Sequence, residues 1–104
     1  MSIEKRPNVI QDVIAALESG QLIPSTHAQQ QMEKRDIQMS DIEEAIYSAY
    51  REESKDSLTD DGKSWKYSLR GKNENGDKDI RIIIAFADPK TIIVTAIDKN
   101  KKED

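Results

Sequence analysis

Apolar residues in the first half of the chain recur at the spacing of amphipathic helices. The spacing predicts a first helix, which Gly20 is placed to end, and two more helices over residues 26–35 and 40–49. The stripe of the first helix contains Val9, Ile10, Val13, Ile14 and Leu17. The later helices open at the spacing of capping boxes, Thr26 with Gln29 and Ser40 with Glu43. We therefore predict three helices within about residues 8–50.

The second half of the chain changes to the patterns of strands. Residues 64–71, "SWKYSLRG", alternate apolar and polar side chains, as a strand with two different faces does. Residues 79–87 and 91–98 are apolar at nearly every position, which indicates strands covered on both faces. Asn75-Gly76 lies between the first two segments and is a hairpin signal. Three consecutive antiparallel strands are predicted.

Two further segments connect these elements. Residues 22–25, "LIPS", are extended because Pro24 disfavours helical backbone before it, which fits an edge strand or a plain connector. Residues 51–62, "REESKDSLTDDG", lack an apolar period and are rich in acids, so we predict a mobile surface loop.

Helices followed by antiparallel strands indicate an α+β fold. We expect one domain over residues 1–104, in which about three helices pack on a small antiparallel sheet of three to four strands. The sheet should occupy about residues 64–98, and residues 99–104 should form a polar tail. Helices then cover one face of the sheet, and the other face is free to carry a site.

Composition restricts the classes of function. The chain has no cysteine, which excludes disulfides and thiolate metal sites. Its longest apolar run, Ile82–Ala87, is too short to span a bilayer, and the N-terminus lacks a signal-peptide core. These features predict a soluble cytoplasmic protein. No helix carries the run of basic residues expected of a protein that binds DNA directly.

The net charge of −4 is unevenly distributed. Residues 1–61 carry 6 Lys/Arg against 13 Asp/Glu, whereas residues 62–104 carry 10 against 7. The overall charge argues against general nucleic-acid binding, but a basic patch in the second half could hold a phosphate. The acidic first half could instead bind a basic protein partner.

The second predicted helix carries the only histidine of the chain. His27, Gln31 and Arg35 stand four residues apart and share one polar stripe. An imidazole can accept a proton and a guanidinium can hold two phosphate oxygens, so the stripe could form one wall of a phosphate site. His27 could equally bond a neighbouring backbone, and Arg35 could favour the helix dipole. A metal site is disfavoured because no carboxylate cluster has ligand spacing, and no cofactor is expected.

The predicted sheet adds a second set of polar groups. Lys66, Ser68 and Arg70 share one strand face, and Arg81 interrupts an otherwise apolar strand, where a cation needs a partner or a function. Further candidates along the strands are Thr95, Lys99 and the aromatic pair Trp65 and Tyr67. Cations converging on one sheet face could support metal-free RNA cleavage by attack of the ribose 2′-hydroxyl. Alternating polar residues can also simply face water.

Residues 27–37, "HAQQQMEKRDI", resemble the H-A-x-x-x-M-x-x-R-x-I segment of a small bacterial family of domains of unknown function grouped with RelE-like toxins. Over most of its length the chain is also similar to the MqsR messenger-RNA interferase toxins, through "EKRPN", "ALESGQLIPSTHA", "SWKYSLR" and "TIIVTAIDKNK". The resemblance implies a microbial-ribonuclease-like fold and a metal-independent endonuclease of a type II toxin-antitoxin system. It also implies RNA as substrate, including ribosome-bound messenger RNA, and a cognate antitoxin protein as partner.

The resemblance also implies site residues. It includes Lys55 before the sheet and gives the last cation as Lys99, directly after Asp98. Together with the pattern of the sheet, it predicts the catalytic residues His27, Arg35, Tyr67 and Arg81. The predicted RNA-binding residues are Lys55, Lys66, Arg70, Thr95 and Lys99.

Two functions remain open. The first is the toxin-like RNA endonuclease, and the alternative is a catalytically inactive protein-interaction domain of the same fold that binds a basic protein partner. The endonuclease hypothesis requires Arg70, Arg81 and Lys99 to gather at one accessible place. It would fail if these side chains pointed apart, or if a neighbouring carboxylate neutralised each of them.

Overall fold

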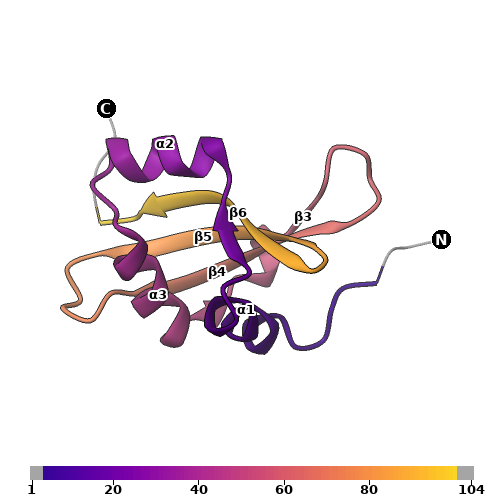
Figure 1. The fold of residues 1–104 in the computed structure, drawn as a ribbon, viewed down its shortest axis with the longest axis horizontal. Helices are drawn as coiled ribbons and strands as arrows, with labels where there is room; N and C mark the ends of the chain where they lie inside the picture. The colour runs from indigo at the N-terminus through magenta and orange to yellow at the C-terminus, as the bar shows by residue number, and fades with distance from the viewer. Residues whose placement is uncertain (1–3, 101–104) are drawn as a thin grey trace.

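A computed structural model describes residues 4–100, so residues 101–104 of the predicted polar tail lie outside the described residues. Figure 1 shows three helices gathered on a twisted sheet. In chain order the elements are α1 (Val9–Glu18), β1 (Leu22–Pro24), α2 (Thr26–Lys34), α3 (Met39–Tyr47), β2 (Tyr50–Arg51), the 3₁₀ helix η1 (Glu53–Lys55), β3 (Ser57–Leu58), β4 (Trp65–Lys72), β5 (Asp79–Ala87) and β6 (Lys90–Asp98). The α+β class and the three helices are confirmed.

The sheet is larger than predicted and is mixed. Its six strands follow the order β1-β6-β5-β4-β2, and β3 also pairs with β4. The strands β4, β5 and β6 form the predicted antiparallel meander, whereas β1 pairs with β6 in parallel. The prediction of a purely antiparallel sheet of three to four strands is therefore wrong. The additional strands are short segments that acquire strand geometry only by pairing with the meander.

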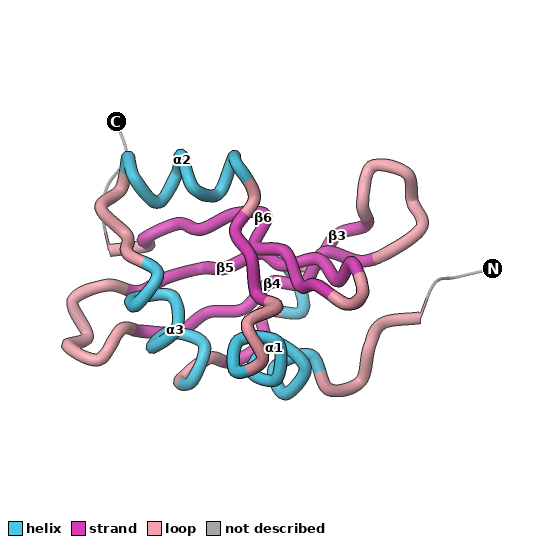
Figure 2. The backbone as a smooth tube through the Cα atoms, viewed as in Figure 1, coloured by secondary structure: helices cyan, strands magenta, loops and turns pink. Residues whose placement is uncertain are grey.

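The core lies between the helices and one face of the sheet (Figure 2). Alternation along β5 directs Ile80, Ile82 and Ile84 to this side, where each is fully buried. The helices cover these residues with Val13, Ile42 and other apolar side chains of the predicted stripes. None of α1, α2 and α3 packs against the opposite face of the sheet, which we call the open face; η1 contacts β4.

Two helix starts differ from the predicted capping boxes. The α2 cap is Ser25, whose hydroxyl oxygen accepts a hydrogen bond from the Ala28 N–H at 3.0 Å, rather than Thr26. The α3 cap is Gln38, which forms a reciprocal capping box with Asp41, rather than Ser40. Each real cap lies one or two residues earlier. Several polar residues precede each helix, so spacing alone did not choose among them.

The predicted loop over residues 51–62 contains regular structure. It includes the last residue of β2 and the whole of η1 and β3. Two of its acidic residues contact the sheet. The Asp56 carboxylate is fully buried and accepts hydrogen bonds from Arg51 and from the Ser68 N–H, the latter at 2.8 Å. Lys5 pairs with the same carboxylate at 3.0 Å. These bonds fix the segment against the edge of β4.

Candidate anion site on the open sheet face

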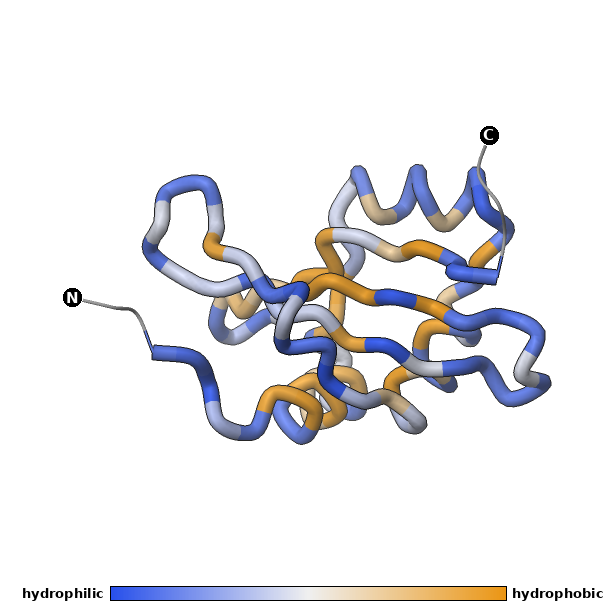
Figure 3. Tube along the Cα trace, turned by 180° about the vertical axis from the view of Figure 1, so that it is seen from behind, coloured by the Kyte–Doolittle hydropathy of each residue, from blue (hydrophilic) through white to orange (hydrophobic). Residues whose placement is uncertain are grey.

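The open face collects most of the cations that the sequence placed on the sheet. By strand register, Arg70 lies opposite Arg81, and the β4 and β5 residues two positions away share their face. Figure 3, which views the molecule from behind, shows hydrophilic stretches that interrupt the hydrophobic course of the central strands. Among the described residues, register places five cations on this face: Lys66, Arg70, Lys72, Arg81 and Lys90. The carboxylates that reach the face are Glu52, after β2, and Asp79 on β5.

Glu52 lies at the centre of this arrangement. One carboxylate oxygen accepts a hydrogen bond from Arg81 Nε at 2.8 Å, and the other accepts one from Arg81 Nη2 at 3.0 Å. The Ser68 hydroxyl donates to the first oxygen at 3.2 Å, and Arg70 Nη1 lies 3.5 Å from the second. The bidentate contact with Arg81 is the geometry in which guanidinium groups also hold phosphate.

Arg70 is held from its other side by Asp79. Its Nε and Nη2 donate to the two Asp79 oxygens at 3.0 and 2.8 Å. Hydrogen bonding to Asp79 raises the pKa of Arg70 above its ordinary value, and the same bond lowers the pKa of Asp79. Both groups are therefore charged at neutral pH, and Asp79 fixes the position of the Arg70 guanidinium.

The charge state of Glu52 follows from the same contacts. Its hydrogen bond with Arg81 lowers the pKa of Glu52, and this effect outweighs the opposing effect of burial. The Arg81 pKa is raised, chiefly by the same hydrogen bond. The Glu52 side chain is 12% exposed and that of Arg81 is 16% exposed, so solvent reaches this ionised pair.

The endonuclease hypothesis required these cations to gather in one place and to lack neutralising carboxylates, and the two arginines meet only the first requirement. They converge, but each is paired with a carboxylate. Lys99 is exposed directly after β6, and its backbone N–H donates to the Asp79 carbonyl oxygen at 2.6 Å. In the described part of the chain, the Lys99 ammonium has no carboxylate within ion-pair distance. The sheet therefore does not bring together three cations that lack carboxylate partners.

The remaining predicted RNA-binding residues surround this centre in different ways. Lys66 lies on the open face of β4, opposite Ala85. Thr95 lies on the same face of β6, opposite Ile83, next to the bulge that begins after Ile93. Lys55 ends η1 and is exposed. Lys66 and Thr95 therefore share the face of Arg81, whereas Lys55 projects from the adjoining segment.

Three of the four predicted catalytic residues lie away from Arg81. Tyr67 is on the opposite face of β4 and is only 3% exposed, and its hydroxyl oxygen accepts a hydrogen bond from the Arg6 N–H at 2.8 Å. His27 is exposed on α2, and Arg35 ends that helix. The strand β6 lies between α2 and β5 (Figure 1). The prediction that these four residues form one site is therefore not met by their positions.

The polar stripe on α2 has a structural contact at its middle position. The Gln31 side-chain oxygen accepts a hydrogen bond from the Ala96 N–H at 3.1 Å. Ala96 lies on β6 beyond the part that pairs with β1, where its amide would otherwise be left at a sheet edge. This contact favours the interpretation of the stripe as part of the scaffold.

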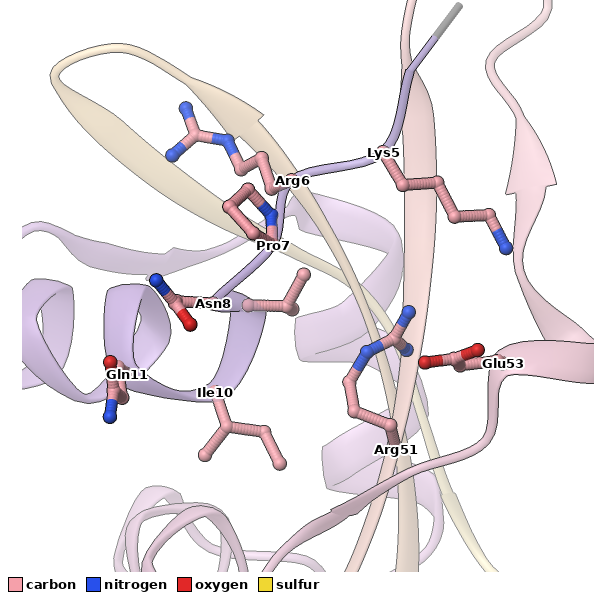
Figure 4. Close-up of a pocket in the computed structure, with 9 residues that line it drawn as sticks. Lys5, Arg6, Pro7, Asn8, Ile10, Gln11, Arg51 and Glu53 are labelled. Carbon is pink, nitrogen blue, oxygen red and sulfur yellow. The ribbon is translucent and has the colours of Figure 1, made fainter.

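A hollow in the described structure lies outside the open face. It has a volume of about 480 Å³ and lies between the N-terminal segment, the start of α1 and the residues Arg51 and Glu53. Figure 4 shows Lys5, Arg51 and Glu53 on one side of it and Asn8 and Ile10 on the other. Lys5 and Arg51 both pair with Asp56. The cations lining this hollow therefore hold the fold together.

The described residues 4–100 contain no group of three or more His, Cys, Asp or Glu side chains placed to hold a metal ion. None of their helices is long and apolar enough to cross a membrane.

Sequence reasoning missed the partners of the arginines. It identified Arg81 as a cation that needs a partner, but it found neither Glu52, which pairs with Arg81, nor Asp79, which pairs with Arg70. Asp79 could have been placed near the arginines from the sequence, since it is two residues before Arg81 on the same strand and shares its face. Glu52 could not, because its position depends on how the segment after α3 crosses the edge of β4.

Taken together, the fold and the site define a small α+β domain with a helix-covered sheet face and an open face rich in paired arginines. Residues 24–98 match the family described as a domain of unknown function, DUF4258. The match covers most of the chain, and the chain belongs to this family. Comparison with curated proteins found no match, and neither did comparison with solved structures.

Proposed function

We propose that this protein is a toxin-like, metal-independent RNA endonuclease that binds RNA on the open sheet face. The observation that carries the proposal is the charge of that face, where, among residues 4–100, five cations meet the carboxylates of Glu52 and Asp79 in a chain whose net charge is −4. A surplus of cations on one exposed surface attracts a phosphate backbone even when the whole molecule is acidic. The resemblance to RelE-like and MqsR toxins supports the same function.

In the proposed reaction, Arg81 and Arg70 hold the phosphate that is attacked by the adjacent 2′-hydroxyl. Their guanidinium groups offset the charge that builds on its oxygens. A phosphate can take this position only by displacing Glu52 from Arg81. The displaced carboxylate loses the hydrogen bond that most lowers its pKa, so it becomes a stronger base and accepts the proton of the 2′-hydroxyl. The P–O5′ bond breaks, the departing 5′-oxygen takes a proton from water to become a hydroxyl, and a 2′,3′-cyclic phosphate remains.

Incubation of the purified protein with RNA in EDTA tests this proposal, with and without ribosomes. We expect fragments that end in a 2′,3′-cyclic phosphate. Arg81→Ala should lower the rate by roughly a hundredfold or more, since it removes the main charge stabilisation. Lys34→Ala on α2 removes one cation from another part of the surface and should leave the rate unchanged. Absence of cleavage in both conditions, together with normal growth of cells that express the protein, would remove the proposal.

The proposal implies a cognate antitoxin protein as partner. The support for this partner is the resemblance of residues 27–37 to the toxin-associated segment, together with the likeness to MqsR. Co-expression of the gene next to this one in its genome should relieve growth arrest if the gene encodes the antitoxin.

A second candidate function is a non-enzymatic domain that binds a basic protein. The observation that favours it is the acidic surround of Tyr47, which is 57% exposed and donates a hydrogen bond to Glu18 at 3.0 Å. Glu43 and Glu44 flank this tyrosine on α3, and in the described residues neither forms an ion pair with a cation. Partner capture that survives Arg81→Ala but is lost in a Glu43→Gln, Glu44→Gln double variant would favour this function over cleavage.

A further inference from the structure

We propose that Ser68, Arg70 and Arg81 form a binding site for a tetrahedral oxyanion, and that the Glu52 carboxylate occupies this site as an internal substitute for phosphate. The inference rests on the proposed function and names its phosphate subsite and its control. Glu52 is then an autoinhibitory group that must leave before an RNA phosphate can bind.

The contacts of Glu52 are those that a phosphate would make. Its two oxygens receive three hydrogen bonds between 2.8 and 3.2 Å from Arg81 and Ser68, and Arg70 lies at 3.5 Å. A phosphate oxyanion accepts bidentate bonds from guanidinium as a carboxylate does, and it offers a further oxygen to Arg70. The site is therefore already shaped for an anion by the groups that bind Glu52.

In this proposal Glu52 leaves the site without unfolding the segment that carries it. It lies between β2 and η1, and its backbone N–H donates to the Ser68 carbonyl oxygen at 3.0 Å. Asp56 anchors the following residues through Arg51 and the Ser68 N–H. Because the backbone is fixed on both sides, we infer that the carboxylate leaves by rotation about the Glu52 side-chain bonds.

Arg70 stays held in place when Glu52 leaves, and Arg81 stays on the same face of the sheet. Asp79 holds Arg70 through two hydrogen bonds of 3.0 and 2.8 Å that do not involve Glu52. Arg81 is opposite Arg70 in the β4–β5 ladder, so the strands keep the two side chains on one face. With Glu52 removed, two cations face one carboxylate. The observed affinity for phosphate is then the intrinsic affinity reduced by the fraction of molecules in which Glu52 has left.

Titration with inorganic phosphate tests the inference directly. Binding is monitored through the side-chain NMR signals of Arg70 and Arg81. Glu52→Gln and Glu52→Ala should bind phosphate roughly tenfold or more tightly than the wild type, because the competing charged hydrogen bonds are weakened or removed. The alanine variant covers the case in which the glutamine amide still bonds Arg81. Glu53→Gln is the matched control, since it removes the same charge from the exposed neighbouring residue.

The inference is overturned if both Glu52 variants keep the wild-type fold by amide NMR but bind phosphate no tighter than Glu53→Gln. A parallel titration with single-stranded RNA separates it from the proposed function. If the Glu52 variants gain phosphate affinity while the wild type neither binds nor cleaves RNA, the anion site stands and the endonuclease proposal falls. If the wild type cleaves RNA but the variants gain no affinity for phosphate, the endonuclease stands and the substitute role of Glu52 falls.

Discussion

Asp56 is the carboxylate on which the segment between α3 and β4 depends. It is fully buried and binds Arg51, Lys5 and the Ser68 N–H. Burial raises the pKa of Asp56, but the hydrogen bonds from Arg51, Ser68 and Lys5 together outweigh it and lower the pKa below its ordinary value. One side chain therefore joins the N-terminal segment, η1 and β4.

Asp56→Asn should lower the free energy of unfolding by about 3 kcal/mol, because it leaves the Arg51 and Lys5 cations without their shared counter-charge. Thermal unfolding at pH 7 measures this loss. Asp60→Asn, in the same acidic segment but exposed, is the matched control and should change stability by less than about 0.5 kcal/mol. Equal effects of the two substitutions would show that the buried network does not hold the segment.

The same argument fixes how this stability depends on pH. Because the folded-state pKa of Asp56 is lowered, its contribution is complete above the unfolded-state pKa of about 3.9 and disappears as pH falls through the folded-state value. The difference between the wild type and Asp56→Asn should therefore shrink below about pH 4. A difference that stays constant down to pH 2 would contradict the charged role of Asp56.

Single residues of the candidate site could be predicted only where one strand fixed them. Alternation placed Lys66 and Arg70 on one face, and Arg81 stood out in an apolar strand. Tyr67 was assigned to the site through its aromatic character, yet the same alternation puts it on the buried face. The charge partners could not be predicted, because ion pairs join segments whose approach depends on the whole fold.

The backbones of α3 and β4 approach each other closely at Gly71. A Cβ built on Gly71 would lie 2.0 Å from the Ala45 carbonyl oxygen and 2.8 Å from its carbonyl carbon. Gly71 also faces Ile80 across the ladder, at the centre of the core. The absence of a side chain at this position is what lets α3 lie directly on the sheet.

Gly71→Ala should therefore separate α3 from β4 and lower the free energy of unfolding by at least about 3 kcal/mol. A second substitution at Ala45 cannot relieve the overlap, since the obstructing atoms belong to the backbone. Gly62→Ala is the control, because its Cβ meets nothing within 4 Å and only its positive φ of +70° opposes alanine. That control should cost about 1 kcal/mol. Chemical denaturation of both variants decides whether close packing or backbone strain dominates.

At this scale the sequence predicted long elements better than short ones. The three helices and the meander followed from periods that extend over many residues. The parallel pairing of β1 with β6 did not, because three residues carry no period and their partner is about 70 positions away, Leu22 with Thr91. β2 and β3 are shorter still, and their strand geometry comes from β4.

The whole molecule separates its charges between two surfaces. The open face collects cations from β4, β5 and β6, whereas α3 and its surroundings present Glu43 and Glu44 beside Tyr47. The net charge of −4 hides this separation, which is why composition alone argued against nucleic acid. An RNA strand should therefore approach from the open face, where its phosphates meet cations and the acidic helices point away.

This orientation predicts how salt should weaken binding of a single-stranded RNA. Each phosphate contact releases about 0.7 of a counterion, so the slope of log affinity against log salt counts the contacts. Lys66→Ala and Lys72→Ala, on the open face, should each weaken binding and make the slope shallower by about 0.7. Lys34→Ala, at the end of α2, removes the same charge elsewhere and should leave the slope unchanged. Equal slopes for all three variants would mean that RNA does not bind on the open face, since only a face-specific contact distinguishes lysines of equal charge.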